Sequence, residues 1–347
     1  MKVAIVGGGI HGTSAAKSLA LRGHEVSLFE QFPINHVRGS SHGESRIVRK
    51  AYPDPFYTSL MAEAYPLWRD LEALAETDLL HEVGLLYLGS DSSANLQSVD
   101  AGLSQVEEPH TIFHFQDVKA VSPQVSLGEH EIAIFTPRAG WVDAHQSVTV
   151  TRHVAERFGA KFHHSQPVER KWLEKNFDAF VVAPGAWILD WAPELNVKVT
   201  LQTVAFLNAA IEGPVWIEDS EKLAYGFPTH DPDLGAKVAF HAMGGPIDPS
   251  TQDRTPDPAQ VSELGRVLER RFALPPLDPI RSYGCLYTNT PDEDFRLGTL
   301  GESGFYVSAC SGHGFKFGPW IGQLMADFVE QRRSPRDFPR FCSGDAR

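Results

Sequence analysis

Short apolar runs and helical periodicity alternate at the start of the chain. Residues 3–6 (VAIV) form an uninterrupted apolar run, which is typical of a parallel strand buried on both faces. Residues 13–21 have helical character, Gly23 ends that helix, and residues 25–30 (EVSLFE) return to a strand pattern. This order of strand, helix and strand within about 30 residues predicts a βαβ unit with parallel strands.

Apolar residues three and four positions apart predict the main helices. In residues 54–74 the apolar positions recur with the period of a helix. Further helices are expected at 143–158 and 256–272, and a last one ends near residue 331. The tail from Arg332 onward is rich in Arg and Pro, so we expect it to be loosely packed.

Strand-like segments fill much of the remaining chain. Residues 160–163, 179–183 and 305–309 have the composition of short strands. From about residue 197 to 245, alternating segments separated by Gly and Pro turns are typical of an antiparallel sheet. The sequence therefore predicts an α/β protein with a parallel part near its start and an antiparallel part later.

Composition and charge narrow the range of partners. The chain has 347 residues, 42% of them hydrophobic, and its 31 basic and 44 acidic residues give a net charge of −13. This balance argues against nucleic acid or an anionic membrane surface as the main partner. An anionic ligand must therefore be held by locally placed Arg or Lys side chains.

Cysteine usage and hydropathy indicate a cytosolic protein. The three cysteines, Cys285, Cys310 and Cys342, are too few and too scattered for a disulfide framework, and no CxxC occurs. No window of about 18 apolar residues predicts a transmembrane helix. The first residues are read as a strand rather than a signal peptide, and the final GDAR is not a peroxisomal tripeptide.

A glycine-rich turn follows the first predicted strand. Gly7, Gly9 and Gly12 satisfy GxGxxG, the spacing that allows a tight turn, close approach of a pyrophosphate and close helix–strand packing. Glu30 ends the second strand, where an acid that binds a ribose is expected. The agreement of strand, turn, helix and acid predicts a dinucleotide site. The fingerprint alone does not separate FAD from NAD, and a turn that binds nothing is the alternative.

Three further motifs carry a family resemblance. GSSHGESRIVRKAY (39–52), GCLYTNTPDEDF (284–295) and SGHGFKFGPWIG (311–322) together resemble the monomeric sarcosine oxidase family, within the D-amino-acid-oxidase-like flavoproteins. This group also includes N-methyltryptophan and pipecolate oxidases. VVAPGAW (181–187) is similar to a family segment near the flavin, and the order of motifs holds along nearly the whole chain.

The resemblance implies an architecture and a cofactor. It implies a Rossmann-like FAD-binding domain interleaved with a substrate domain of mainly antiparallel sheet plus helices. We expect residues 1–75, 140–196 and 285–347 to form the FAD-binding domain, and residues 76–139 and 197–284 to form the substrate domain. The substrate domain is somewhat shorter than in the best-known members.

The resemblance also implies contacts to the flavin. Cys285 matches the position at which such enzymes attach the flavin 8α-methyl carbon as a thioether, and its alternative role is that of a small buried hydrophobe. Further cofactor contacts are implied for residues of the 39–52 and 311–322 motifs: Ser40, Ser41, His42, Gly312, Gly314 and Lys316. A helix that begins near Gly314 would direct its N-terminus at the flavin.

A carboxylate-binding pair is implied by the same motifs. Arg49 and Lys316 match the family residues that bind the substrate carboxylate, where Arg offers bidentate geometry and Lys a point charge. A solvated Arg and a Lys that extends its amine to solvent are the alternatives. Arg46 matches a residue over the flavin that sets its electrostatics, against the simpler possibility of a salt bridge to Glu44 or another acidic residue.

Two residues of AKVAFH match the reacting end of the family site. Lys237 matches the lysine that activates oxygen, and His241 matches an active-site histidine that positions the substrate. Four residues apart on a strand, the two side chains face the same side. Tyr225 and Tyr287 match pocket-wall tyrosines, and Trp216 is a further candidate for the wall; each is otherwise an ordinary core aromatic residue.

The sequence therefore predicts an FAD-dependent oxidase of a secondary amino acid, N-methylated or cyclic. Its products are an imine, which water converts to an aldehyde and a primary amine when acyclic, and hydrogen peroxide. We expect a monomer that uses oxygen and a small amino acid, without a metal ion. The alternatives are a dehydrogenase of the same fold with another electron acceptor, a nicotinamide-dependent reductase, and a nucleotide-binding module without chemistry.

Overall fold

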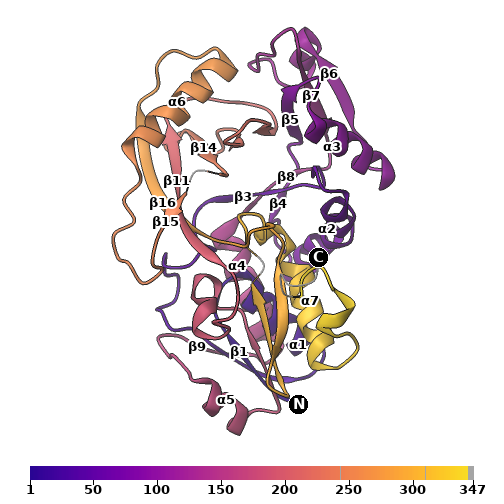
Figure 1. Cartoon of the computed structure of the whole chain (residues 1–347), viewed down its shortest axis with the longest axis vertical. Coiled ribbons are helices and arrows are strands. Elements are labelled where there is room, and N and C mark those ends of the chain that lie inside the picture. Colours follow the sequence, from indigo (N-terminus) through magenta and orange to yellow (C-terminus); the bar gives the residue numbers. More distant parts are fainter. Residues whose placement is uncertain (243, 309, 343–347) are drawn as a thin grey trace.

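The structure is a computed structural model that describes residues 1–342 except Met243 and Ala309. Figure 1 shows two parts along the longest axis of the molecule. The lower part contains both β1 and the helices α1, α4 and α7, and the upper part contains α6 with β11, β14 and β16 on one side. The chain passes between the two parts several times, as expected for interleaved domains.

A six-stranded sheet forms the centre of the lower part. Strand β1 is buried at Val3, Ala4 and Ile5 because sheet neighbours and helices cover it on both sides. All neighbours in this sheet are parallel except β17 and β18, which are antiparallel. In order across the sheet the strands are β17 (Arg296–Leu300), β18 (Gly304–Ser308), β10 (Ala179–Val182), β1 (Lys2–Val6), β2 (Glu25–Phe29) and β9 (Lys161–His163).

Helices cover this sheet and share one apolar core. Helix α1 packs against both α4 and α7, and the approach to α7 is close because Gly322 has no side chain beside Ser14. Their apolar residues join those of α2 in a single hydrophobic cluster. The helices of this part are α1 (Ile10–Leu21), α2 (Pro55–Ala75), α4 (Ala144–Arg157), α5 (Arg170–Asn176) and α7 (Gly318–Val329).

A larger sheet forms the upper part, and its strand pairs are antiparallel except β5 with β12. Helix α6 (Pro258–Phe272) packs on one face, and α3 (Ala94–Gln105) packs on the other near β5. In order the strands are β15 (Gly245–Pro246), β11 (Lys198–Leu207), β14 (Ala236–Phe240), β13 (Ala224–Gly226), β12 (Val215–Glu218), β5 (Leu85–Ser90), β7 (Glu131–Thr136) and β6 (Thr111–His114), and β16 (Pro279–Asn289) pairs with β11.

Small elements connect the two parts. A three-stranded sheet has the order β3 (Ser45–Val48), β8 (Gly140–Asp143) and β4 (Leu80–His81). Four short 3₁₀ helices complete the described elements: η1 (Phe115–Ala120), η2 (Gly185–Asp190), η3 (Phe315–Phe317) and η4 (Pro335–Asp337). No helix in the described part of the chain is long and apolar enough to cross a membrane.

The predicted elements are present with small shifts at their ends. The predicted helices at 54–74, 143–158 and 256–272 are α2, α4 and α6, each within two residues of its observed bounds. The predicted strand 305–309 is β18, although Ala309 and the final GDAR lie outside the described residues. The domain boundaries stay a prediction, and the boundary between residues 284 and 285 falls inside β16.

Two expectations are corrected. No continuous helix begins near Gly314: the short helix η3 comes first, and α7 begins at Gly318. The described part of the tail is not loosely packed, because Phe341 is buried against Phe295 and Arg340 pairs with the buried carboxylate of Asp294. An aromatic anchor and an ion pair therefore hold a segment whose composition predicted a loose end.

Candidate functional site

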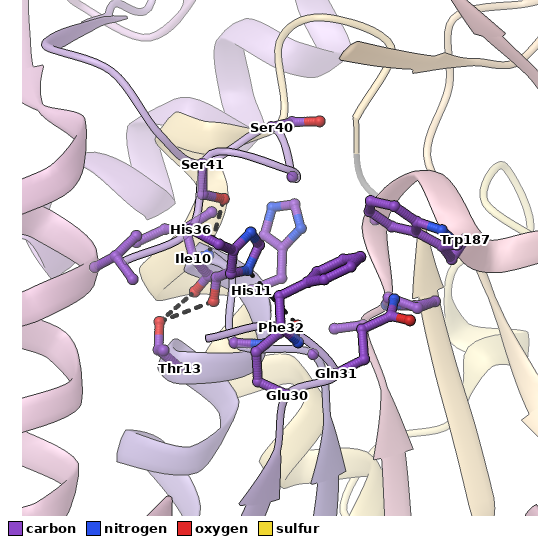
Figure 2. Close-up of a pocket in the computed structure, with 18 of the residues that line it drawn as sticks. Ile10, His11, Thr13, Glu30, Gln31, Phe32, His36, Ser40, Ser41 and Trp187 are labelled. Atoms are coloured by element: carbon purple, nitrogen blue, oxygen red, sulfur yellow. Dashed lines mark hydrogen bonds and ion pairs between the residues drawn. The ribbon is translucent and has the colours of Figure 1, made fainter. Parts of the chain in front are cut away.

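A cavity of about 480 Å³ lies at the carboxyl end of β1 and extends to β16. Its lining includes the glycine turn 7–9, Glu30, the loop 39–42, Cys285 and Gly312. Figure 2 shows part of this lining, with Glu30, His36, Ser40, Ser41 and Trp187 around one space. The predicted nucleotide end and the predicted cysteine, 278 positions apart from Gly7 to Cys285, thus share one cavity.

The glycine turn requires glycine at its first and third positions. Gly7 has φ of 101°, and a Cβ atom there would lie 2.2 Å from the carbonyl oxygen of Ala183. A Cβ atom on Gly12 would lie 1.9 Å from the carbonyl oxygen of Gly7. Helix α1 begins without a side-chain cap at Gly9, although the backbone N–H of Ile10 donates to Ser41 Oγ at 3.1 Å. The helix start therefore offers free N–H groups to a phosphate.

Glu30 is held in place by the backbone and by a histidine. Its carboxylate accepts from the N–H of Gly8 at 2.7 Å and from the N–H of Phe32 at 2.9 Å, and His36 lies 3.6 Å away. Burial raises the pKa of this carboxyl, but the hydrogen bonds from His36, Gly8 and Phe32 lower it below its ordinary value overall. The carboxylate is thus a fixed acceptor at the place expected for a ribose-binding acid.

The loop 39–42 brings unpaired polar atoms to the cavity. Ser40 Oγ and His42 Nε2 are buried and have no partner among the described residues, and both residues line the cavity. Burial and the nearby Arg46 lower the pKa of His42 to about 4, so the ring is neutral. Buried polar atoms normally have partners, so these atoms indicate a ligand with complementary groups.

Cys285 lies in the middle of β16 and is 5% exposed. Gln202 of β11 pairs with it across the sheet, and its Sγ lies 3.8 Å from Nη2 of Arg46. Arg46 also donates to the carbonyl oxygens of Ser40 and His42 at 2.9 and 2.7 Å. The simpler possibility for Arg46 is not observed, because Glu44 pairs with Arg281 instead.

Beyond Cys285, aromatic rings meet at Gly312. A Cβ atom on Gly312, whose φ is 72°, would lie 2.2 Å from the ring of Tyr287 and 2.6 Å from the ring of His241. The hydroxyl groups of Tyr225 and Tyr287 lie 3.3 Å apart. Burial lowers the pKa of His241 to about 4, with Arg49 and Lys316 as smaller causes. A neutral imidazole and two phenols therefore gather in one place.

Arg49 and Lys316 approach this place from two segments of the chain. Lys316 is 6% exposed, and its Nζ donates to Tyr52 Oη at 3.0 Å and to the carbonyl oxygen of His313 at 2.9 Å. Burial and then the charge of Arg49 hold the pKa of Lys316 well below its ordinary value. Arg49 forms no hydrogen bond with the described residues, and its Nη1 is buried without a partner.

Lys237 comes from β14 and is 3% exposed. Its Nζ donates to the carbonyl oxygen of Ser45 at 2.7 Å, next to Arg46 on β3. Burial and then the charge of Arg46 lower the pKa of Lys237 to about 7. His241 is the residue after the end of β14, so the AKVAFH segment supplies one residue to the Arg46 side and one to the Tyr287 side.

Trp216 does not belong to this group. It lies in the core under α6, with its ring 5.6 Å from the ring of Phe272. A Cβ atom on Gly226 would meet its indole, so it points to the face of the sheet opposite Tyr225, the residue before Gly226. The expectation that Trp216 lines the pocket is therefore corrected.

Sequence reasoning missed several residues of the site. His11 reaches the carbonyl oxygen of Gly314 with its Nε2 at 3.1 Å and thereby joins the glycine turn to the start of η3. The rings of Phe32 and Trp187 lie 5.1 Å apart at the cavity wall (Figure 2). Trp187 could have been predicted as a site residue, because it ends the VVAPGAW segment that resembles a family segment near the flavin. Phe32 and His11 carry no sequence signal of their own.

The fold and the cavity define an FAD-dependent oxidoreductase. The parallel sheet, the glycine turn at a helix start and Glu30 provide for the nucleotide, and Ser40, His42 and Cys285 lie where a ring system would extend. These residues fit FAD. The described residues hold no group of three or more His, Cys, Asp or Glu side chains that is arranged for a metal ion.

Comparison with known proteins agrees with this assignment. A model of the FAD dependent oxidoreductase (DAO) family matches residues 2–328, and the chain belongs to this family. Monomeric sarcosine oxidase of Streptomyces avermitilis is 32% identical over 357 residues, which cover 94% of this chain and 93% of that protein. N-methyl-L-tryptophan oxidase of Yersinia pestis is 29% identical over 362 residues, with 97% of each chain covered.

Solved structures share the fold. The open form of NikD, described as an unusual amino acid oxidase essential for nikkomycin biosynthesis, has a TM-score of 0.82 at 24% identity and covers 98% of this chain and 96% of its own. The predicted family, fold class and enzyme class, an FAD-dependent oxidoreductase, are therefore confirmed. The nicotinamide-dependent alternative is not supported, because the matching family uses FAD.

Proposed function

We propose that this protein oxidises the secondary amine of an N-methylated or cyclic amino acid, with oxygen as the electron acceptor. The observation that carries the proposal is the pair of basic residues Arg49 and Lys316: Lys316 is buried, and Arg49 is half-buried with its Nη1 atom inaccessible. Neither forms an ion pair with a described acidic residue, although the chain has an excess of acidic residues. A guanidinium and a buried amine without a counter-ion favour an anionic ligand of the size of one carboxylate, and the charge of that ligand would favour the protonated form of Lys316.

The neighbours of the cations support an amine substrate. His241, neutral at pH 7, lies beside Tyr287, and its ring nitrogens can accept from or donate to the amine without adding charge. Tyr225 and Tyr287 offer aromatic surface to the alkyl groups of the amine and to positive charge that develops on it. The carboxylate would thus be fixed at one end and the amine directed toward the cavity at the other.

The cofactor supplies the redox chemistry. When bound, FAD accepts two electrons from the C–N unit and transfers them to oxygen, which yields hydrogen peroxide. The residues that would hold it are those of the glycine turn, Glu30, the loop 39–42, and Cys285 with Gly312 and Gly314. We further propose that Cys285 Sγ would form a thioether with the 8α-methyl carbon. The S–H bond and one methyl C–H bond are lost as two protons, and the two electrons go through the flavin to oxygen, the acceptor proposed above. The position of Cys285 in the cavity wall supports this link.

Lys237 and Arg46 would serve the oxygen side. Lys237, buried at the junction of β3 and β14, provides a cation next to the cavity, and a fixed cation stabilises negative charge as oxygen is reduced. Arg46 holds the loop 39–42 through its carbonyl oxygens and adds a second positive charge. We propose a monomer in the cytosol; the three free cysteines in the described residues are consistent with a reducing compartment.

A peroxide-coupled assay under air tests the proposal. The purified yellow protein should release peroxide with sarcosine, other N-methyl amino acids or cyclic amino acids such as pipecolate. Arg49→Met and Lys316→Met should each lower kcat/KM by about 100-fold or more, because each leaves the carboxylate with one cation. Lys171→Met, at an exposed position, is the matched control and should retain the activity of the parent.

Three results would contradict the proposal. Peroxide from primary amino acids alone would assign another substrate class. Reduction of the flavin without peroxide would favour the dehydrogenase alternative. Equal turnover in Arg49→Met and in the parent protein would show that Arg49 does not bind the substrate carboxylate.

A further inference from the structure

Arg49 is held by aromatic rings instead of hydrogen-bond acceptors. Its guanidinium carbon lies 4.0 Å from the ring centre of Tyr52 and 5.8 Å from the ring centre of Tyr87. Among the described residues no acceptor or carboxylate pairs with it, and Nη1 is buried without a partner. The guanidinium is therefore fixed through its π contacts, while its N–H groups stay available.

Tyr52 also contacts the second cation. Its ring is 5% exposed, and its hydroxyl accepts from Lys316 Nζ at 3.0 Å. Burial raises the pKa of this phenol above its ordinary value, so the hydroxyl stays neutral and does not act as a counter-ion. One neutral side chain thus contacts both the guanidinium of Arg49 and the amine of Lys316 and fixes the spacing between them.

Tyr87 belongs to the other part of the molecule. It lies on β5 of the large sheet and is fully buried, and its hydroxyl has no partner among the described residues. Tyr52 follows β3 at the start of the chain region that leads to α2. Arg49 therefore contacts one ring from each part.

The chemistry of guanidinium explains the use of rings. All five N–H donors of arginine lie in one plane, so rings that contact the faces of the group leave every donor free. A carboxylate in place of a ring would occupy the same edge that a substrate carboxylate needs and would compete with it. A neutral aromatic contact fixes the side chain without this competition.

We propose that Tyr52 and Tyr87 are positioning residues that hold Arg49, and through Tyr52 also Lys316, in the geometry that binds a carboxylate. This inference rests on the proposed function, in which Arg49 and Lys316 form the carboxylate site. It goes further because it proposes that two tyrosines, one of them in the substrate domain, determine how tightly and how selectively that site binds anions.

The test compares a charged and a neutral ligand of one shape. The holoenzyme is titrated with acetate and with acetamide, and binding is followed by the change in the visible flavin spectrum. Tyr87→Leu should weaken acetate binding about fivefold, and Tyr52→Leu about 20-fold, because the Tyr52 ring is closer to the charge. Acetamide binding should change by less than about twofold, because acetamide lacks the charge.

Variants that retain the ring separate positioning from packing. Tyr87→Phe should recover most of the acetate affinity that Tyr87→Leu loses. Tyr52→Phe should recover the part that depends on Arg49 but not the part that depends on the hydrogen bond from Lys316. With an active substrate, the leucine variants should raise KM more than they lower kcat. Ile112→Ala, at an exposed position on β6, is the unrelated control.

The outcomes are distinguishable. If Tyr87→Leu does not fold, Tyr87→Met removes the ring at similar length and carries the same expectation. Equal losses for acetate and acetamide, or equal losses in the phenylalanine and leucine variants, would overturn the positioning role. If the parent binds acetate selectively but no N-methyl or cyclic amino acid yields peroxide, the proposed function fails while the aromatic support of Arg49 stands.

Discussion

At the residue scale, this site is defined by charges that the protein leaves without counter-ions. Lys316 and Lys237 are buried and Arg49 is half-buried, yet none of the three forms an ion pair with a described acidic residue. Desolvation without a partner is costly, and a folded chain retains such groups where a ligand or a reaction uses them. Because the chain has more acidic than basic residues, the absence of acidic partners among the described residues at these three positions is unexpected.

Replacement of Cys285 tests the covalent link. Sγ lies at the wall of the cavity and no other described cysteine shares its strand, so Cys285→Ser should release the flavin on acid precipitation. The parent protein should keep its yellow colour in the pellet. Cys310→Ser is the control, because Cys310 also lines the cavity but should not carry the flavin. A colourless pellet from the parent would disprove the thioether.

Lys237 predicts a pH dependence of stability. Its pKa of about 7 in the folded state, against the ordinary lysine value of 10.5, means that the unfolded chain binds more protons between these pH values. The resulting destabilisation is complete below about pH 7 and is relieved as the pH rises toward 10.5. Lys237→Met should therefore be more stable than the parent by about 5 kcal/mol at pH 6.5, and the difference should shrink at pH 10.

Chemical unfolding of both proteins at the two pH values measures this difference. Other titrating groups are common to the two proteins and cancel in the comparison. Lys171→Met, with an exposed lysine, should show no pH-dependent difference from the parent. A stability gain that grows with pH would mean that Lys237 is charged in the folded state throughout.

The sequence predicted single residues where a motif carried them. Cys285, Arg49 and Lys316 come from three motifs. The structure places Cys285 in the cavity wall and places Arg49 and Lys316 near His241. Tyr52 ends the first of these motifs, but its contact with Arg49 depends on ring orientation, which spacing does not determine. Tyr87 has no motif at all, because a tyrosine in a buried strand is read as core.

At the element scale, local patterns were sufficient for helices and strands but not for the last segment. Helices α2, α4 and α6 follow from apolar periodicity, since each buries one face. The segment after α7 has no such period. It is fixed by Phe338 and Phe341, whose partners come from distant positions, and such partners are not visible in the local sequence.

The C-terminal segment provides a stability prediction. Arg340 pairs with Asp294, which is fully buried, and also with Asp54 at the start of α2. Arg340→Ala takes this cation away from the interior carboxylate, so the free energy of unfolding should fall by about 2 kcal/mol or more. Arg336→Ala, at an exposed position in the same segment, should change it by less than about 0.5 kcal/mol.

Denaturant unfolding of the two alanine variants and of the parent measures how much Arg340 contributes to the free energy of unfolding. Similar values for Arg340→Ala and Arg336→Ala would mean that the tail adds little to the fold. Arg340→Ala is also made in the Asp54→Asn variant. If it no longer lowers the free energy of unfolding there, the effect belongs to the exposed Arg340–Asp54 pair at the start of α2.

At the scale of the whole molecule, the site exists only because the chain returns several times between its two parts. Glu30 and Arg49 come from the first 50 residues, Tyr87 and Lys237 from the large sheet, and Cys285 from a strand that crosses a predicted domain boundary. The sequence predicted this interleaving through the family resemblance. The hydrophobic pattern alone predicted a parallel and an antiparallel sheet, but not that the chain alternates between them.

This arrangement predicts that the cofactor stabilises the molecule as a whole. The cavity is lined by segments from residue 6 to residue 315, so bound FAD would contact elements of both parts. In Cys285→Ser the cofactor should be exchangeable, and each tenfold rise in free FAD above the dissociation constant should add about 1.4 kcal/mol to the free energy of unfolding. A cofactor joined to Cys285 by the proposed thioether would not be lost by dilution, so added FAD should leave the melting temperature of the parent unchanged. Thermal unfolding of both proteins over a range of FAD concentrations tests this. If the melting temperature of the parent rises with FAD as that of Cys285→Ser does, the covalent link is absent. If the melting temperature of Cys285→Ser does not change with FAD, the cofactor does not stabilise the molecule as a whole.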